Sequence, residues 1–102
     1  MKNCCTNNNQ NYKKIEESAE LLKAVAEPNR LRILCALSKE KICVCDLAES
    51  LEIPQNLLSF HLKTLYEAGI LKKQRDGNNI YYLIKKDWNE RIEKIFEFLG
   101  IK

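Results

Sequence analysis

Two cysteines separated by one residue, Cys43 and Cys45, are the part of the chain best suited to do chemistry. Asp46 follows them directly, and two further cysteines, Cys4 and Cys5, stand side by side near the start of the sequence. Thiolates are the ligands that soft metal ions prefer in proteins. These two pairs therefore predict a site for a thiophilic ion, with all four thiols as candidate ligands.

The backbone between Cys43 and Cys45 decides whether both sulfurs can reach one ion. On a regular helix two such positions point about 200° apart, whereas in an extended strand residues i and i+2 share a face. The pair lies where an extended segment is expected to pass into a helix, so a bound ion would hold or distort the start of that helix. The alternative is that both are small buried residues, because free cysteine packs well in cores.

The second pair, Cys4 and Cys5, lies in an asparagine-rich segment, residues 1–11, that lacks apolar periodicity. We expect this segment to be a mobile tail that offers these thiols no core to join. One tail cysteine together with Cys43 and Cys45 would suit As(III), Sb(III) or Pb(II), and a fourth ligand would suit Cd(II) or Zn(II). The sequence leaves the choice open, and we expect such an ion to be an inducer, not a permanently bound cofactor.

The composition fits one folded domain. The chain has 102 residues, of which 45% are hydrophobic and 30% charged, and we expect the domain to span residues 12–102. No apolar run is long enough to cross a bilayer, and the first residues lack the apolar stretch of a signal peptide. We therefore expect a cytoplasmic protein with reduced thiols and no membrane partner.

The periodicity of apolar residues predicts the elements that must position these groups. Asp46 is expected to cap the third helix, and Gly69 to end the fourth. Helices are expected over residues 12–26, 28–38, 46–51, 55–68 and 87–99, with strands over 70–74 and 80–84 around a turn at 75–79. Two helices joined by a tight turn and followed by a hairpin predict a mainly α winged helix-turn-helix of order α-α-α-α-β-β-α.

The first and last helices carry more apolar side chains than closure of a small fold needs, including Trp88 and Phe96. We expect a symmetric homodimer through these two helices; the alternative is that both only cover the core of one monomer. Cys35, beside Leu31 and Leu34 on the second helix, is expected to pack in the core.

The charge distribution favours a nucleic-acid partner. The net charge is +3, but residues 55–86 hold six basic residues and only two acidic ones, Glu67 and Asp76. The helix from Gln55 is the expected reader of the major groove of double-stranded operator DNA. The expected DNA contacts are Gln55, Asn56, Ser59, Phe60, His61, Lys63, Lys72, Lys73, Arg75, Asn78 and Asn79. For His61 the alternative is a partly buried residue, because it lies at helical spacing from Leu58 and Leu65. For each of the others an ordinary solvated side chain is the alternative.

The assembled motifs resemble the ArsR/SmtB family of metal-responsive winged-helix repressors. The resemblance covers about Leu21 to Leu99 and rests on residues 24–34, 42–47, 59–69 and 81–83. Within the family the chain most resembles the thiolate-sensing branch of arsenite, cadmium and lead sensors, which carry the same Cys-Val-Cys-Asp segment. It implies a homodimer that represses its operator until an ion weakens the complex. In the cadmium and lead sensors, N-terminal cysteines complete the site with the Cys-x-Cys of the other subunit.

Two alternative functions are a redox- or persulfide-sensing repressor and a thiol enzyme. Redox- or persulfide-sensing relatives pair a cysteine of the second helix with one of the last helix; Cys35 could be the former, but the last helix has none. The last helix also lacks the histidine that zinc-sensing relatives use there. A thiol enzyme is disfavoured, because there is no Cys-x-x-Cys near a βαβ pattern, no phosphate loop and no pair of carboxylates in a cleft.

Overall fold

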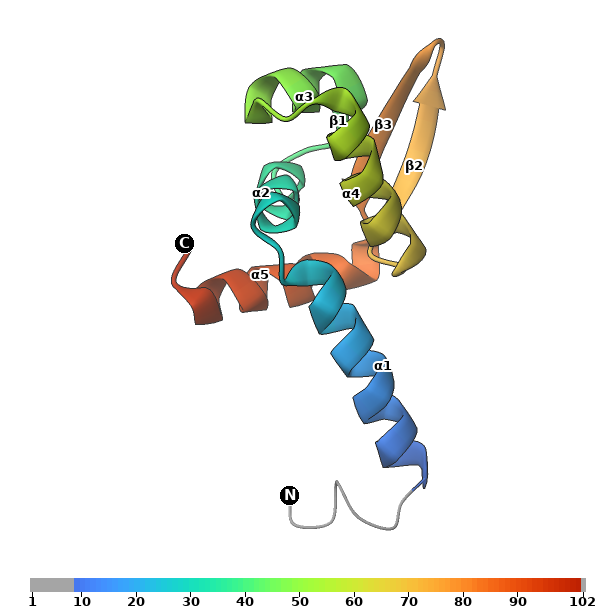
Figure 1. Cartoon of the computed structure of the whole chain (residues 1–102), viewed down its shortest axis with the longest axis vertical. Coiled ribbons are helices and arrows are strands. Elements are labelled where there is room, and N and C mark those ends of the chain that lie inside the picture. The colour runs from blue at the N-terminus through green and yellow to red at the C-terminus, as the bar shows by residue number, and fades with distance from the viewer. Residues whose placement is uncertain (1–8, 102) are drawn as a thin grey trace.

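The computed structural model describes residues 9–101, which form five helices and a three-stranded sheet. Figure 1 shows their arrangement. The elements are α1 (Asn9–Val25), α2 (Pro28–Leu37), β1 (Ile42–Cys43), α3 (Val44–Leu51), α4 (Gln55–Glu67), β2 (Leu71–Asp76), β3 (Asn79–Ile84) and α5 (Lys86–Leu99). This order confirms the predicted mainly α winged helix-turn-helix, with β1 as an additional strand.

The beginning of α1 differs from the expectation. The helix starts at Asn9, three residues before Tyr12, and so includes the last residues of the segment that we expected to be a tail. Apolar periodicity cannot detect a first helical turn made of polar residues. Cys4 and Cys5 lie outside the described residues.

The sheet has the order β1-β3-β2 and is antiparallel throughout. β2 and β3 form the wing, in register from Leu71 opposite Ile84 to Asp76 opposite Asn79. The loop is thus only Gly77–Asn78, and the expected five-residue turn was too long. Gly77 has a φ of 65°, which a residue without Cβ adopts at little cost.

The helix-turn-helix consists of α3 and α4. α4 buries one face, made by Leu58, His61, Leu62 and Leu65. Between the helices, Glu52 has a left-handed backbone (φ 55°) and ends α3. This conformation lets the backbone N–H of Ile53 donate to the carbonyl oxygen of Ala48, so that the chain turns within three residues.

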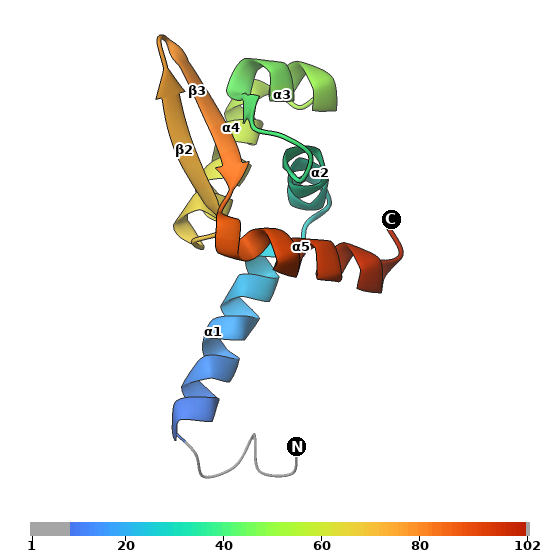
Figure 2. The same cartoon turned by 180° about the vertical axis from the view of Figure 1, so that it is seen from behind.

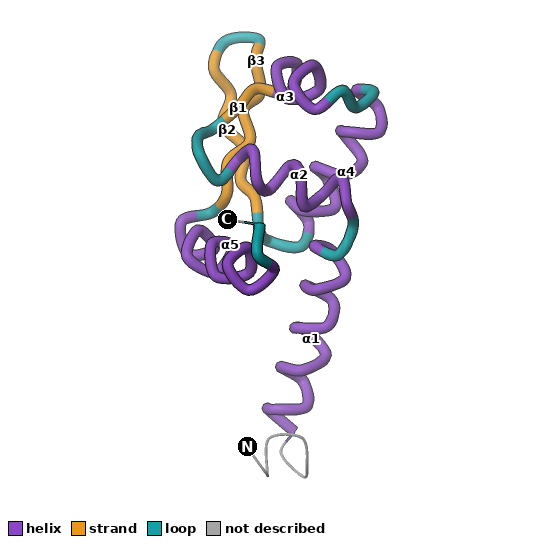
Figure 3. The backbone as a smooth tube through the Cα atoms, turned by 90° about the vertical axis from the view of Figure 1, so that its left-hand side faces the viewer, coloured by secondary structure: helices purple, strands orange, loops and turns teal. Residues whose placement is uncertain are grey.

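The winged end and α1 lie on opposite sides of the molecule. In Figures 1 and 2 the wing tip and α3 lie together, while α1 projects the other way and α5 crosses between the two regions. Figure 3 shows the same projection from the side. The molecule therefore measures 50 × 27 × 23 Å along its principal axes. Within residues 9–101 no helix is long and apolar enough to cross a membrane.

Candidate thiol site and nucleic-acid interface

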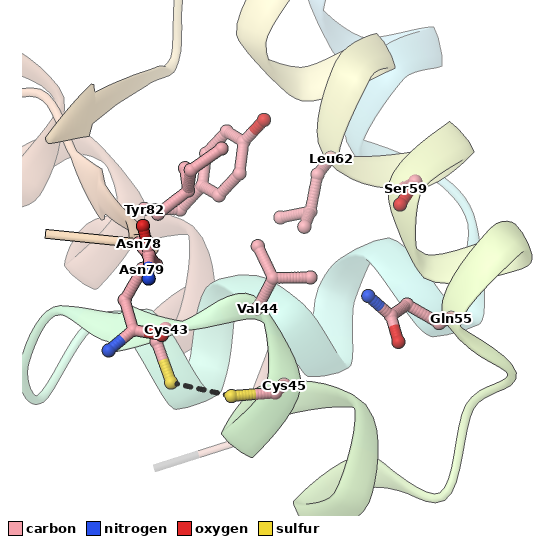
Figure 4. Close-up of a pocket in the computed structure, with 10 residues that line it drawn as sticks. Cys43, Val44, Cys45, Gln55, Ser59, Leu62, Asn78, Asn79 and Tyr82 are labelled. Atoms are coloured by element: carbon pink, nitrogen blue, oxygen red, sulfur yellow. Dashed lines mark hydrogen bonds between the residues drawn. The ribbon is translucent and has the colours of Figure 1, made fainter. Parts of the chain in front are cut away.

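The Sγ atoms of Cys43 and Cys45 lie 3.2 Å apart. Cys43 is the last residue of β1 and the N-cap of α3, with an extended backbone (φ −76°, ψ 155°), and Cys45 lies in the first turn of α3. The junction of strand and helix therefore brings together two side chains that a regular helix would point apart. In Figure 4 the two sulfurs face each other.

The third helix begins two residues earlier than predicted, at Val44, so Cys43 and not Asp46 is its N-cap. The reason is β1, which was not predicted as a strand. Cys43 pairs with Tyr81 and Ile42 with Tyr82, and this pairing holds the chain extended up to the helix. A two-residue strand is too short to leave a period in the sequence. Asp46 instead contributes a carboxylate to the first turn, where the helix dipole favours negative charge.

Cys43, Cys45 and Asp46 are arranged as a group of potential metal ligands. Among the described residues their two Sγ atoms and one carboxylate oxygen all lie within 4.8 Å of one another. Two thiolates on one tetrahedral ion, with bonds of about 2.3 Å, lie about 3.8 Å apart. The observed sulfur separation is close to this value, so small side-chain rotations would let both thiols bind one soft ion. The donor set fits the expected class of ligand.

The pKa of the Cys43 thiol is raised. The backbone N–H of Asp46 favours the thiolate and acts in the other direction. It is outweighed by the hydrogen bond with Cys45, by the Asp46 carboxylate and by desolvation. The thiol is therefore protonated at neutral pH, and an ion that binds it must displace the proton.

A pocket of about 320 Å³ connects the thiol pair to the wing and the helix-turn-helix. Its lining comes from three places: the β1–α3 junction, the first turns of α4, and the wing from its loop to Tyr82 (Figure 4). The lining residues are Cys43, Val44, Cys45, Gln55, Ser59, Leu62, Asn78, Asn79, Ile80 and Tyr82. A change at the thiols thus has a short route to both predicted DNA-reading elements.

Most predicted DNA contacts have exposed side chains. On α4 these are Gln55, Asn56, Ser59, Phe60 and Lys63, and on the wing they are Lys72, Lys73, Arg75, Asn78 and Asn79. The ammonium group of Lys73 lies 4.4 Å from the centroid of the Tyr66 ring, which ties the wing to α4. The wing and α4 are therefore in contact, and both carry exposed basic side chains.

His61 is the exception. Its side chain is 5% exposed and points into the interior, with Nε2 at 3.9 Å from a carboxylate oxygen of Glu27. It lies on the buried face of α4 with Leu58 and Leu65, so a direct DNA contact of this side chain is not compatible with the structure. The burial agrees with the expectation from the spacing of His61 from Leu58 and Leu65, and it leaves the expected DNA contact of this side chain without support.

The structure also places Lys41 beside the wing and Cys35 against the core. Lys41 was not among the predicted contacts, yet its ammonium donates to Gln74 Oε1 at 3.1 Å and lies 5.3 Å from the centroid of the Tyr81 ring, so it adds positive charge beside the wing. Its place depends on the unpredicted strand β1. Cys35 is half-buried and packs against the hydrophobic core, as predicted.

Residues 27–73 match the sequence profile described as bacterial regulatory protein, arsR family. The chain is 37% identical over 67 residues to a transcriptional repressor SmtB homologue of Synechocystis sp., covering 66% of this chain and 51% of that protein. It thus spans about half the length of this relative. An arsenical resistance operon repressor of Staphylococcus xylosus is 30% identical over 85 residues, covering 83% of this chain and 82% of the relative.

The crystal structure of NolR from Sinorhizobium fredii is similar over a longer range. It superposes with a TM-score of 0.81 at 33% identity, covering 92% of this chain and 95% of NolR. The matched segment 27–73 includes α3, α4 and the thiol pair. None of these relatives is named as an enzyme, in keeping with the expectation from the sequence. The chain belongs to the ArsR family of bacterial regulatory proteins.

Proposed function

We propose that this protein is a metal(loid)-responsive transcriptional repressor, which binds operator DNA as a homodimer and leaves it when a thiophilic ion binds Cys43 and Cys45. The observation that carries the proposal is the 3.2 Å separation of the two Sγ atoms, at a junction that shares a pocket with α4 and the wing. The named relatives include an arsenical resistance operon repressor, which supports the same class of ligand.

Exposed apolar surface on α1 and α5 supports the proposed homodimer. Tyr12, Ile15 and Leu22 on α1 are exposed, as are Phe98 and Leu99 at the end of α5. Between the two helices is a mainly apolar pocket of about 260 Å³, lined by Leu21, Leu22, Val25, Trp88 and Ile95 among others. A large apolar patch of this kind marks an interaction site. A symmetric dimer through α1 and α5 would cover it and set two copies of α4 for two half-sites.

The coupling of ion to DNA follows from the position of Cys43. Cys43 is paired with Tyr81 of β3, and Cys45 lies in the helix that leads to α4. An ion that holds both sulfurs fixes the β1–α3 junction, and this shifts the wing relative to α4. A difference of about 1–3 kcal/mol between the two states would weaken the operator complex about 5–150-fold, and by linkage DNA would weaken ion binding equally.

The test uses DNA that the reduced protein itself selects from a random duplex library. Fluorescence anisotropy then follows release as As(III), Sb(III), Cd(II), Pb(II) or Zn(II) is added, with sulfur-to-metal absorption recorded in parallel. Cys43→Ser and Cys45→Ser should bind DNA normally and lose the response, because one hard oxygen cannot replace a thiolate. Cys35→Ser is the control and should respond like the wild type.

Several results would overturn this assignment. Normal ion response in Cys43→Ser would show that the site is elsewhere. Release by peroxide or persulfide, with no ion effective, would favour the redox alternative. Affinity that does not fall with added salt would argue against phosphate contacts by the wing and α4.

The part of Cys4 and Cys5 is tested separately with Cys4→Ser, Cys5→Ser and the double variant. We propose that one or both complete the site in the dimer, so the double variant should keep DNA binding and lose affinity for Cd(II) and Pb(II). Arsenite response can survive in part through a third, non-protein ligand. Unchanged absorption and release by every ion would remove the tail from the site.

Ion binding should also strengthen as pH rises. Because the pKa of Cys43 is raised, the thiol holds its proton at neutral pH and the ion must compete with it. Below that pKa the ion affinity should rise about tenfold per pH unit for each proton displaced. An affinity independent of pH between 6 and 8 would contradict thiol ligation.

A further inference from the structure

Phe60 is the one expected DNA contact of α4 whose side chain is apolar, so neither a phosphate contact nor a hydrogen bond to a base edge accounts for it. Its side chain is 59% exposed, although α4 has a well-formed buried face elsewhere. With about 100° between successive residues, Asn56, Phe60 and Lys63 fall on the face opposite Leu58, Leu62 and Leu65. An aromatic ring thus stands between a polar and a basic side chain, at the centre of the surface that would enter a groove.

The Phe60 ring contacts the ring of a buried residue. It meets the ring of His61 edge to face, with centroids 5.5 Å apart and an angle of 62° between the planes. His61 is buried, so it gives the ring a fixed support. The remaining surface of the ring faces outward and is preorganised for an apolar contact.

The surroundings of Phe60 indicate what that contact would be. Lys63 is on the same face of α4, and Lys73 of the wing lies against Tyr66 of the same helix, so basic side chains on and beside α4 suit a polyanion. The major groove of DNA offers one apolar group that differs between bases, the 5-methyl group of thymine. Phe60 lies two turns or less from Gln55, the first residue of the helix, where recognition helices contact base edges.

We infer that Phe60 contacts the 5-methyl group of a thymine in each half-site and is a specificity-determining residue of this protein. This inference rests on the proposed function, since it needs α4 to enter the major groove. Asn56 and Lys63 flank the contact with polar groups for an adjacent base edge or phosphate. Loss of one buried methyl contact should weaken binding about fourfold, and loss in both half-sites about 15-fold.

The test removes the methyl group from the DNA and the ring from the protein. Duplexes selected by the wild-type protein are remade with deoxyuridine in place of thymidine at one position of both half-sites at a time, which deletes only the two methyl groups. At one such position the substitution should lower the affinity of the wild-type protein about 15-fold. Phe60→Ala should bind the thymine and uracil versions of that duplex equally. Leu57→Ala, which removes a neighbouring exposed side chain of α4, is the control and should keep the wild-type preference.

The outcomes separate this inference from the function on which it rests. If the wild type selects a sequence but no uracil substitution matters, or if Phe60→Ala keeps the methyl preference, the contact is wrong and the repressor proposal stands. If the wild-type protein selects no DNA sequence, both the methyl contact and the repressor proposal are wrong. A changed sedimentation coefficient of Phe60→Ala, with unchanged DNA preference, would instead assign the ring to contact with a second copy and overturn the inference.

Discussion

Two helices of similar pattern, α4 and α1, bury their apolar side chains very differently. On α4, Leu58, Leu62 and Leu65 are completely or almost completely buried within the chain. On α1, Tyr12 and Leu22 are more than 60% exposed, and the helix projects from the remaining elements (Figure 1). Helical spacing predicts an apolar stripe in both cases but not what covers it. Where the chain itself supplies no partner, the exposed stripe points to another molecule.

The sharpest test of this contrast is the same substitution in both helices. Leu58→Ala removes a fully buried side chain and should lower the free energy of unfolding by about 2–5 kcal/mol, because a cavity remains. Leu22→Ala removes a side chain that is 62% exposed and should cost far less in a dilute monomer. Urea denaturation of both variants measures the difference. Equal losses would mean that α1 is packed as firmly as α4.

A second substitution asks whether the α1 stripe is covered by another copy. Leu22→Glu places a charge in the proposed interface and should weaken the dimer at least about tenfold, since an unpaired charge is costly to bury. Lys23→Gln changes the net charge equally at an exposed neighbouring position and is the control. Sedimentation equilibrium reports the association constant. A dimer of unchanged strength would place the interface elsewhere.

Glu27 lies between α1 and α2, and its carboxylate is near His61 of α4. We expect the stability of the fold to depend on pH through this residue. Its carboxylate accepts the backbone N–H of Arg30 at 2.9 Å and so caps α2. This bond is the main cause of a lowered pKa, with a smaller contribution from nearby His61. The cap therefore stabilises the fold above the ordinary carboxyl pKa of 4.5 and is lost as pH falls through the lower folded value.

Replacement of Glu27 by Ala should accordingly lower the melting temperature by a few degrees at pH 7, and by less near pH 3. Differential scanning fluorimetry across this range measures the effect. Glu27→Gln keeps an acceptor oxygen and should recover part of the loss at neutral pH. An effect of equal size at both pH values would show that the charge is irrelevant.

The smallest effect is expected on the solvated side of α1. Glu20 and Lys23 form a salt bridge of 3.3 Å, with about three quarters of each side chain exposed. Surface pairs of this kind contribute little, so Glu20→Gln should change the melting temperature by no more than about 1 °C. A larger drop would mean that this side of α1 is also covered.

The fold could be predicted because most of its helices and strands are marked by local patterns in the sequence. Apolar spacing marked α2, α4 and α5, Pro28 marked a helix start, and Asp76–Gly77 marked the hairpin. β1 could not be predicted, since two residues have no period and their pairing with β3 is a long-range contact. That pairing also moved the start of α3 from Asp46 to Val44.

The candidate site was predictable in residue type and in the change from extended to helical backbone at the cysteine pair, but not in its distances. Cys43 and Cys45 were identified from their spacing, whereas the 3.2 Å sulfur separation depends on the strand that the sequence did not show. The sequence gives two expectations for His61: a DNA contact, because it lies in α4, and partial burial, because it shares its helical phase with Leu58 and Leu65. The structure agrees with the second. Phase within a helix decides whether a polar residue faces inward or outward.

The unequal exposure of the two thiols has a consequence for how the proposed ion site can change in evolution. Cys43 is buried in the strand pairing, but Cys45 is exposed in the first turn of α3. A surface position tolerates exchange with small effects on folding. The proposed second sulfur ligand, Cys45, can thus be gained or lost by a single substitution while the winged fold persists. Descendants of one scaffold can therefore change the ions that they detect without first passing through an unstable intermediate.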